Sequence, residues 1–130
     1  MTFETLGAEP FVSLTTFRRS GVGVPTTVWV ARDGDALLVT TPRGSGKVKR
    51  LRNDARVELA PSSRFGKVGD GGPAVAGLGE LLDDDAARER CNEIMQEKYG
   101  LEYRAMMGIE KLGRKGSANR VIVRIIERTS

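Results

Sequence analysis

Glycine, serine and lysine lie together at Arg43-Gly44-Ser45-Gly46-Lys47, where a basic run begins that continues to Arg56. Phosphate binding requires N–H donors and positive charge in one concave place, and glycines let the backbone approach an anion closely. Ser45 adds a hydroxyl group and Lys47 an ammonium group, while Arg50 follows three residues later on the same face of a predicted helix. The segment therefore predicts a phosphate site, with a solvated basic helix face as the alternative.

Four neighbouring residues extend this candidate site. Lys49 projects from another side of the predicted helix, yet near the helix start it can reach the same anion. Thr40 and Thr41 end the strand that leads into the loop, and one of them points inward, although strand propensity explains threonines here equally well. Trp29 is the only tryptophan, and it is either a wall beside a planar ring or an ordinary core residue.

The composition excludes several kinds of chemistry. The chain has no histidine, which removes the commonest general base and any histidine-ligated metal site, and we predict no metal. The single cysteine, Cys91, excludes an intramolecular disulfide and is predicted to be a small core residue of an amphipathic helix. No side chain is identified as catalytic, so any reaction depends on a bound cofactor, on water or on other polar groups.

Length and hydropathy predict one soluble domain over residues 1–130. Hydrophobic residues make up 39% of the chain and charged residues 29%, and no apolar run approaches the roughly 18 residues of a membrane span. The N-terminus lacks the features of a signal peptide. We therefore expect a cytoplasmic protein that does not bind membranes.

The elements that position these residues are mostly strands. Alternating and β-branched patterns predict six strands, at 11–17, 24–32, 36–41, 56–60, 73–82 and 119–126, with a hairpin turn at Asp33-Gly34. Helices are predicted at 46–53, with Ser45 as its cap, from Asp83 to Gly100, and from Leu101 onward. This order predicts an α+β, mainly β protein: a small antiparallel barrel with about three helices. The last predicted strand is apolar on both faces, so both faces are expected to be buried. Another subunit can pack against the second face.

These segments resemble the split β-barrel superfamily of pyridoxamine 5′-phosphate oxidase, and within it the deazaflavin (coenzyme F420)-dependent oxidoreductases. The resemblance covers nearly the whole chain and is carried by F-V-S-L-T-T-F at 11–17, P-T-T-V-W-V at 25–30, G-D-A-L-L-V-T-T at 34–41, S-G-K-V-K-R-L-R-N-D-A-R-V at 45–57, E-K-Y-G-L-E-Y-R at 97–104 and R-V-I-V-R-I at 120–125. Thr27 departs from the family's frequent P-T-P-V-W pattern, which puts local strand pairing in question. The sequence also lacks the long C-terminal extension with an Arg/His pair for pyridoxal phosphate.

The resemblance implies a homodimer with two cofactor sites at the subunit interface. The strand containing Thr26, Thr27, Val28 and Trp29 would run along the ring system of the cofactor. The strand end at Thr40 and Thr41, together with Ser45, Gly46, Lys47, Lys49 and Arg50, would hold its phosphate-bearing tail, with Lys47 as the firmest assignment.

The function that this implies is hydride transfer from reduced F420 to a planar conjugated acceptor such as an enone, a quinone or a tetrapyrrole. The alternatives are an FMN-binding flavoprotein of the same fold and a cofactor-binding protein without turnover. The net charge of +4 also suggests nucleic acid, but aromatic residues make up only 5% of the chain, so few stacking platforms exist and we expect no such partner. Arg64 and Lys67, in the glycine-containing segment 62–72, are further candidates for contact with an acidic cofactor tail.

Overall fold

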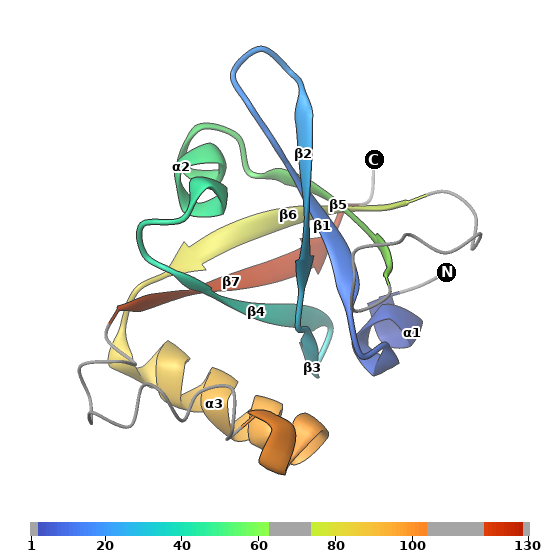
Figure 1. The fold of residues 1–130 in the computed structure, drawn as a ribbon, viewed down its shortest axis with the longest axis vertical. Helices are drawn as coiled ribbons and strands as arrows, with labels where there is room; N and C mark the ends of the chain where they lie inside the picture. Colours follow the sequence, from blue (N-terminus) through green and yellow to red (C-terminus); the bar gives the residue numbers. More distant parts are fainter. Residues whose placement is uncertain (1–2, 63–73, 104–118, 129–130) are drawn as a thin grey trace.

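The computed structural model describes residues 3–62, 74–103 and 119–128, and in this part of the chain seven strands form one antiparallel sheet (Figure 1). The strand order is β2-β1-β5-β6-β7-β4-β3. The strands are β1 (Val12–Phe17), β2 (Gly23–Val28), β3 (Ala31–Asp33), β4 (Ala36–Pro42), β5 (Arg56–Pro61), β6 (Val75–Leu82) and β7 (Arg120–Glu127). The helices are α1 (Phe3–Ala8), α2 (Gly46–Asn53) and α3 (Asp85–Tyr99).

The sheet curls because its two edge strands are neighbours in the sequence. β2 and β3 lie at opposite edges of the strand order, yet only Trp29 and Val30 separate them in the chain. Two residues span only about 7 Å, so the edges must meet there. The result is a half-open barrel, as the sequence patterns predicted.

The predicted strand at 24–32 is two strands, which makes the total seven instead of six. Up to Val28 the chain pairs with β1, where Val28 is the partner of Val12, and from Ala31 it pairs with β4, where Ala31 is the partner of Leu38. The β-branched composition shows extended backbone but not a change of partner, so the break was invisible in the sequence. The predicted hairpin is confirmed: Asp33 pairs with Ala36, and Gly34 has φ +62°, a value that favours glycine.

The main core fills the concave side of the curled sheet, with a helix near each end. Its strand residues include Leu14, Val39 and Ile125, all fully buried, while α2 contributes Leu51. The short α1, which was not predicted, contributes Phe3 and Leu6. Six residues are too few for a clear helical period, so α1 depends on this burial instead of on its own propensity.

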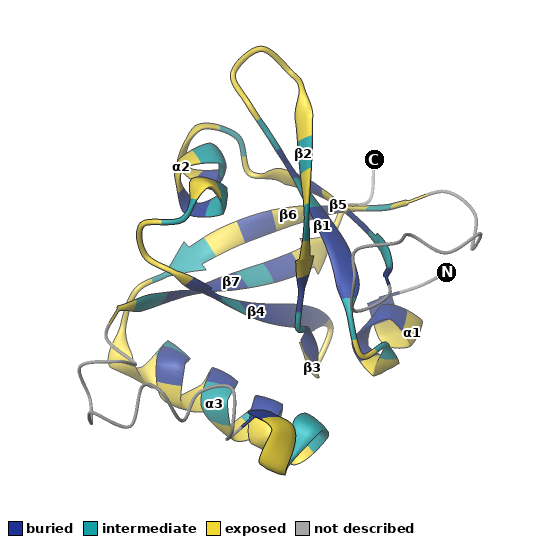
Figure 2. Ribbon diagram, viewed as in Figure 1, coloured by how far each residue is buried: buried dark blue, intermediate teal, exposed yellow. Residues whose placement is uncertain are grey.

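A second, smaller core lies on the convex side, where α3 packs against β3, β4 and β7 (Figure 2). Cys91 and Met95 from α3 meet Leu38 and Ile122 there, and all four are buried. The expectation that Cys91 is a core residue is thus confirmed. The same packing shows that α3 of the same chain covers one end of β7, whereas Ile126 at the other end is 42% exposed.

The ends of α3 follow the predicted signals. Asp84 is the N-cap, and its carboxylate accepts a hydrogen bond of 3.2 Å from the amide of Ala87. Gly100 ends the helix at φ +60°. The predicted helix from Leu101 lies largely outside the described residues, as do Arg64 and Lys67. None of the described helices is long and apolar enough to cross a membrane.

Candidate functional site

The predicted phosphate segment folds as a tight connection between the end of β4 and the start of α2. Ser45 occupies the N-cap position, but its hydroxyl makes no bond to a helix amide. Instead, the Ser45 Oγ lies 3.0 Å from the Oγ1 of Thr41, which is buried. The predicted side-chain cap is therefore wrong in detail. The structure places two hydroxyl groups side by side at the first turn of α2, whose amides carry the positive end of the helix dipole.

Three cationic side chains lie close enough to interact electrostatically in this region, and we call Lys47, Arg50 and Arg120 the basic cluster. Arg50 donates from Nε to the Oγ1 of Thr16 at 2.6 Å. Arg120, from the start of β7, donates from Nε to the Oγ1 of Thr40 at 2.9 Å and from Nη2 to the Thr40 carbonyl at 3.1 Å. Hydroxyl groups of the sheet thus hold both guanidinium groups in place, and half-buried Lys47 is close enough to both to feel their positive charges.

The electrostatics of the basic cluster favour an anion. Burial lowers the pKa of Lys47, and the positive charges of Arg50 and Arg120 lower it further. Within the described residues, neither Lys47 nor Arg50 forms an ion pair with a carboxylate. Five other arginines of the described structure do form such pairs: Arg32, Arg43, Arg56, Arg88 and Arg90. A bound anion would stabilise this uncompensated positive charge.

Gly46 allows the compact shape of this site. A Cβ atom added at Gly46 would lie 2.7 Å from Nη1 of Arg50, which is closer than real contacts allow. The guanidinium of Arg50 therefore lies directly against the backbone at the start of α2. Glycine therefore suits position 46 because it leaves room for the Arg50 side chain. The sequence had suggested a different reason, the close approach of an anion to the backbone.

The other predicted site residues are not all brought into the basic cluster. Lys49 is exposed on α2. Thr26 donates to the carbonyl of Leu14 at 3.4 Å, and the register puts Thr26 on the same face of the sheet as Thr16, which binds Arg50. Thr27 is exposed and Val28 is buried. Of the predicted ring-binding residues, Thr26 thus lies on the same sheet face as the Thr16 hydroxyl that binds Arg50.

Trp29 lies in an aromatic group with α3 and its C-terminal extension. Its ring stacks on Tyr99, with centroids 4.5 Å apart and an angle of 27° between the planes, and the Tyr103 ring is 6.0 Å away. This arrangement fits the core interpretation of Trp29.

Sequence reasoning missed Thr16 and Arg120. Thr16 is buried on β1 and Arg120 opens β7, and they lie 34 and 80 positions from their respective partners Arg50 and Thr40. Arg120 reaches Thr40 because β7 pairs with β4: Thr41 is the register partner of Val121, and Pro42 is the register partner of Arg120. No local motif reports such long-range neighbours.

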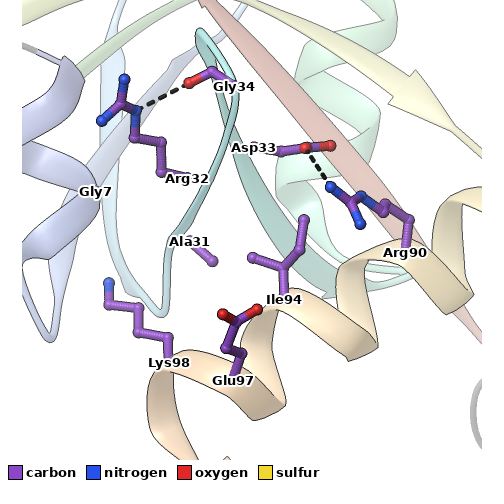
Figure 3. A pocket seen from close by; sticks show the side chains of 9 residues that line it. All are labelled: Gly7, Ala31, Arg32, Asp33, Gly34, Arg90, Ile94, Glu97 and Lys98. Carbon is purple, nitrogen blue, oxygen red and sulfur yellow. Dashed lines mark hydrogen bonds and ion pairs between the residues drawn. The ribbon is translucent and has the colours of Figure 1, made fainter.

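The cavity between α3, α1 and β3 lies away from the basic cluster and shares no residue with it (Figure 3). It has a volume of about 460 Å³ and is lined by Gly7, Ala31, Arg32, Asp33, Gly34, Arg90, Ile94, Glu97 and Lys98. The side chains of the basic cluster are each only partly exposed on this chain.

A curled antiparallel sheet with small helices at its ends defines the split-barrel class of fold. Residues 2–129 match the family model for pyridoxamine 5′-phosphate oxidase, and the chain belongs to this family. The resemblance found in the sequence is thereby confirmed. No curated protein sequence matches the chain closely enough to count as a relative.

Solved structures of similar fold carry several kinds of name. A conserved hypothetical protein of Mycobacterium tuberculosis is 21% identical, with a TM-score of 0.71, and the match covers 99% of this chain and 82% of that one. A structure named F420 reductase is 18% identical, with a TM-score of 0.65 and coverage of 99% and 95%. A FAD-binding protein of Mesorhizobium loti is 16% identical, with a TM-score of 0.61 and coverage of 97% and 84%. At these identities the likeness establishes the fold.

Proposed function

We propose that this protein is an oxidoreductase that binds coenzyme F420 through the basic cluster. The observation that carries the proposal is the uncompensated charge of Lys47 and Arg50 beside the hydroxyl groups of Thr41 and Ser45. Charge-assisted bonds to phosphate oxygens are among the stronger hydrogen bonds in proteins, and the start of a helix adds amide donors. Family membership and the fold shared with an F420 reductase support the same choice.

The residues present fit a phosphorylated, ring-containing cofactor. Lys47, Arg50 and Arg120 would hold the phosphate, while the edge strand β2, with Thr26 facing the Thr16 side of the sheet, offers a backbone along which a planar ring can lie. When bound, the reduced deazaflavin supplies a hydride for a planar conjugated acceptor such as an enone, a quinone or a tetrapyrrole. The protein contributes placement and charge, which are the main protein contributions in cofactor enzymes.

We further propose that the protein works as a homodimer in which a second subunit completes each cofactor site. The side chains of the basic cluster are partly exposed in the single chain, whereas cofactor pockets generally bury most of their ligand. A partner subunit would supply the missing wall. It would also cover Leu78 and Ile126, which are register partners on β6 and β7 and are 37% and 42% exposed.

FMN is the second candidate cofactor, because its phosphate would satisfy the same basic cluster and a FAD-binding protein shares the fold. The deciding experiment is a fluorescence titration of the cofactor-stripped protein with F420 and, in parallel, with FMN. We expect micromolar or tighter binding of F420 and much weaker binding of FMN. The reverse preference would make the protein a flavoprotein, and binding of neither cofactor would refute the oxidoreductase proposal.

A further inference from the structure

The start of α3 lies beside the basic cluster, although none of the cluster's residues comes from that helix. β4 and β6 end and β7 begins at one end of the sheet, where α2 and α3 start (Figure 1). Pro42 is the register partner of Arg120 there, and Leu82 pairs with β7 two residues further on. The segments that carry the cluster and the segment that leads into α3 therefore meet at this end of the sheet.

One carboxylate, that of Asp83 in the connection between β6 and α3, binds two arginines. Its Oδ1 accepts a hydrogen bond of 2.7 Å from Nη1 of Arg88, and its Oδ2 pairs with Nη1 of Arg43. Arg88, whose side chain is only 10% exposed, also donates to the backbone carbonyl of Arg120 at 3.3 Å and to Asp85 at 2.9 Å. A continuous chain of contacts thus joins Arg43, Asp83, Arg88 and the backbone of Arg120.

The two ends of this chain of contacts carry the basic cluster. Arg43 begins the loop that leads into α2, which provides two residues of the cluster, and Arg120 is the third. The Arg43 amide also donates to the carbonyl of Asn119 at 2.7 Å, so the loop and the start of β7 are joined directly through the backbone. Side chains and backbone thus hold the two segments in one arrangement, and Asp83 is the group that both arginine side chains share.

We propose that Asp83 is a positioning residue for the basic cluster, acting through Arg43 on the loop before α2 and through Arg88 on the start of β7. The inference rests on the proposed function, because it treats the cluster as the phosphate site of the cofactor. By charge alone, a carboxylate near this site repels a phosphate, so its removal should tighten binding. By position, its removal releases the segments that carry the cluster, so binding should weaken. The two effects have opposite signs, and a titration separates them.

The test is Asp83→Asn, which replaces one of the two carboxylate oxygens by an NH2 donor that cannot pair with a guanidinium group. Titrated with F420, the variant should have a Kd about threefold to tenfold above that of the natural sequence. Asp33→Asn is the matched control, since Asp33 pairs with Arg90 of the same helix at 3.1 Å but lies at the cavity away from the basic cluster, and here the Kd should not change. An unchanged or lower Kd for Asp83→Asn would overturn the proposal.

A second background separates positioning from a general loss of stability. The effect of Asp83→Asn on the Kd should be smaller in an Arg120→Gln background, because the part that passes through Arg120 is already lost. A general loss of stability would act equally in both backgrounds, so equal effects would contradict the positioning role.

Amide hydrogen exchange distinguishes a failure of this inference from a failure of the proposed function. Without cofactor, Asp83→Asn should speed the exchange of the Arg43 amide several-fold, as measured by NMR, because the loop loses its side-chain contact. The Arg18 amide, which donates to the Val22 carbonyl at 3.0 Å in the β1–β2 turn, should exchange as in the natural sequence. If the natural sequence binds neither F420 nor FMN, the proposed function fails, and the exchange of the Arg43 amide still decides whether Asp83 holds this backbone. Unchanged exchange at Arg43 would overturn the positioning role.

Discussion

At the scale of single residues, Lys47 is the side chain with which the proposed cofactor site is most directly tested. Lys47→Ala should weaken F420 binding by about 1.5–3 kcal/mol, or roughly ten- to 150-fold in Kd, because a charge-assisted bond to phosphate is lost. Exposed Arg52, on the same helix, provides the matched control, and Arg52→Ala should bind almost normally. Unaltered affinity in the Lys47 variant would remove Lys47 from the site.

Cys91 gives a second prediction at this scale. Burial raises the pKa of its thiol to about 12, so the folded protein holds it as the unreactive thiol at pH 8. A thiol reagent at pH 8 should label Cys91 slowly in the native protein and rapidly in guanidinium chloride. Rapid native labelling, followed by absorbance, would mean that α3 opens readily from the sheet.

At the scale of elements, the start of α2 couples helix geometry to anion binding. Gly46→Ala places a Cβ atom against the Arg50 guanidinium, whose flexible side chain must then move. Alanine favours a helix over glycine, so the melting temperature should not fall. Cofactor affinity should nevertheless decrease, as measured by the same titration. An unchanged affinity would show that the position of Arg50 is unimportant for binding.

The connection between β2 and β3 is held in place by Tyr99, the last residue of α3. The Tyr99 hydroxyl lies 2.8 Å from the Pro10 carbonyl oxygen and 2.9 Å from that of Val30, and it accepts a bond of 3.1 Å from the Val30 amide. Tyr99→Phe keeps the ring that stacks on Trp29 but leaves the amide of a fully buried residue without its partner. The free energy of unfolding should fall by about 1–3 kcal/mol in urea denaturation. No change in the midpoint would mean that water replaces the hydroxyl.

At the scale of the whole molecule, the proposed homodimer requires a face that a single chain leaves uncovered. Ile126→Glu puts a charge on the exposed end of β7, beside Leu78. Sedimentation velocity should show a dimer for the natural sequence and a shift toward monomer for the variant, because burying an unpaired carboxylate is costly. Leu101→Glu, at a position that is 79% exposed beyond α3, is the control. A monomer at all concentrations in the natural sequence would refute the dimer proposal.

The sequence by itself determined most of the elements and predicted the kind of ligand. Asp33-Gly34 specified a hairpin, Asp84 and Gly100 bounded α3, and the Gly/Ser/Lys segment predicted an anion site, because turn, cap and charge signals are local. The tertiary structure decided what depends on distant pairing. It split the strand at Trp29 by a change of partner and placed Trp29 on Tyr99. It also brought Thr16 and Arg120 to the basic cluster, because sheet register joins residues that the sequence keeps far apart.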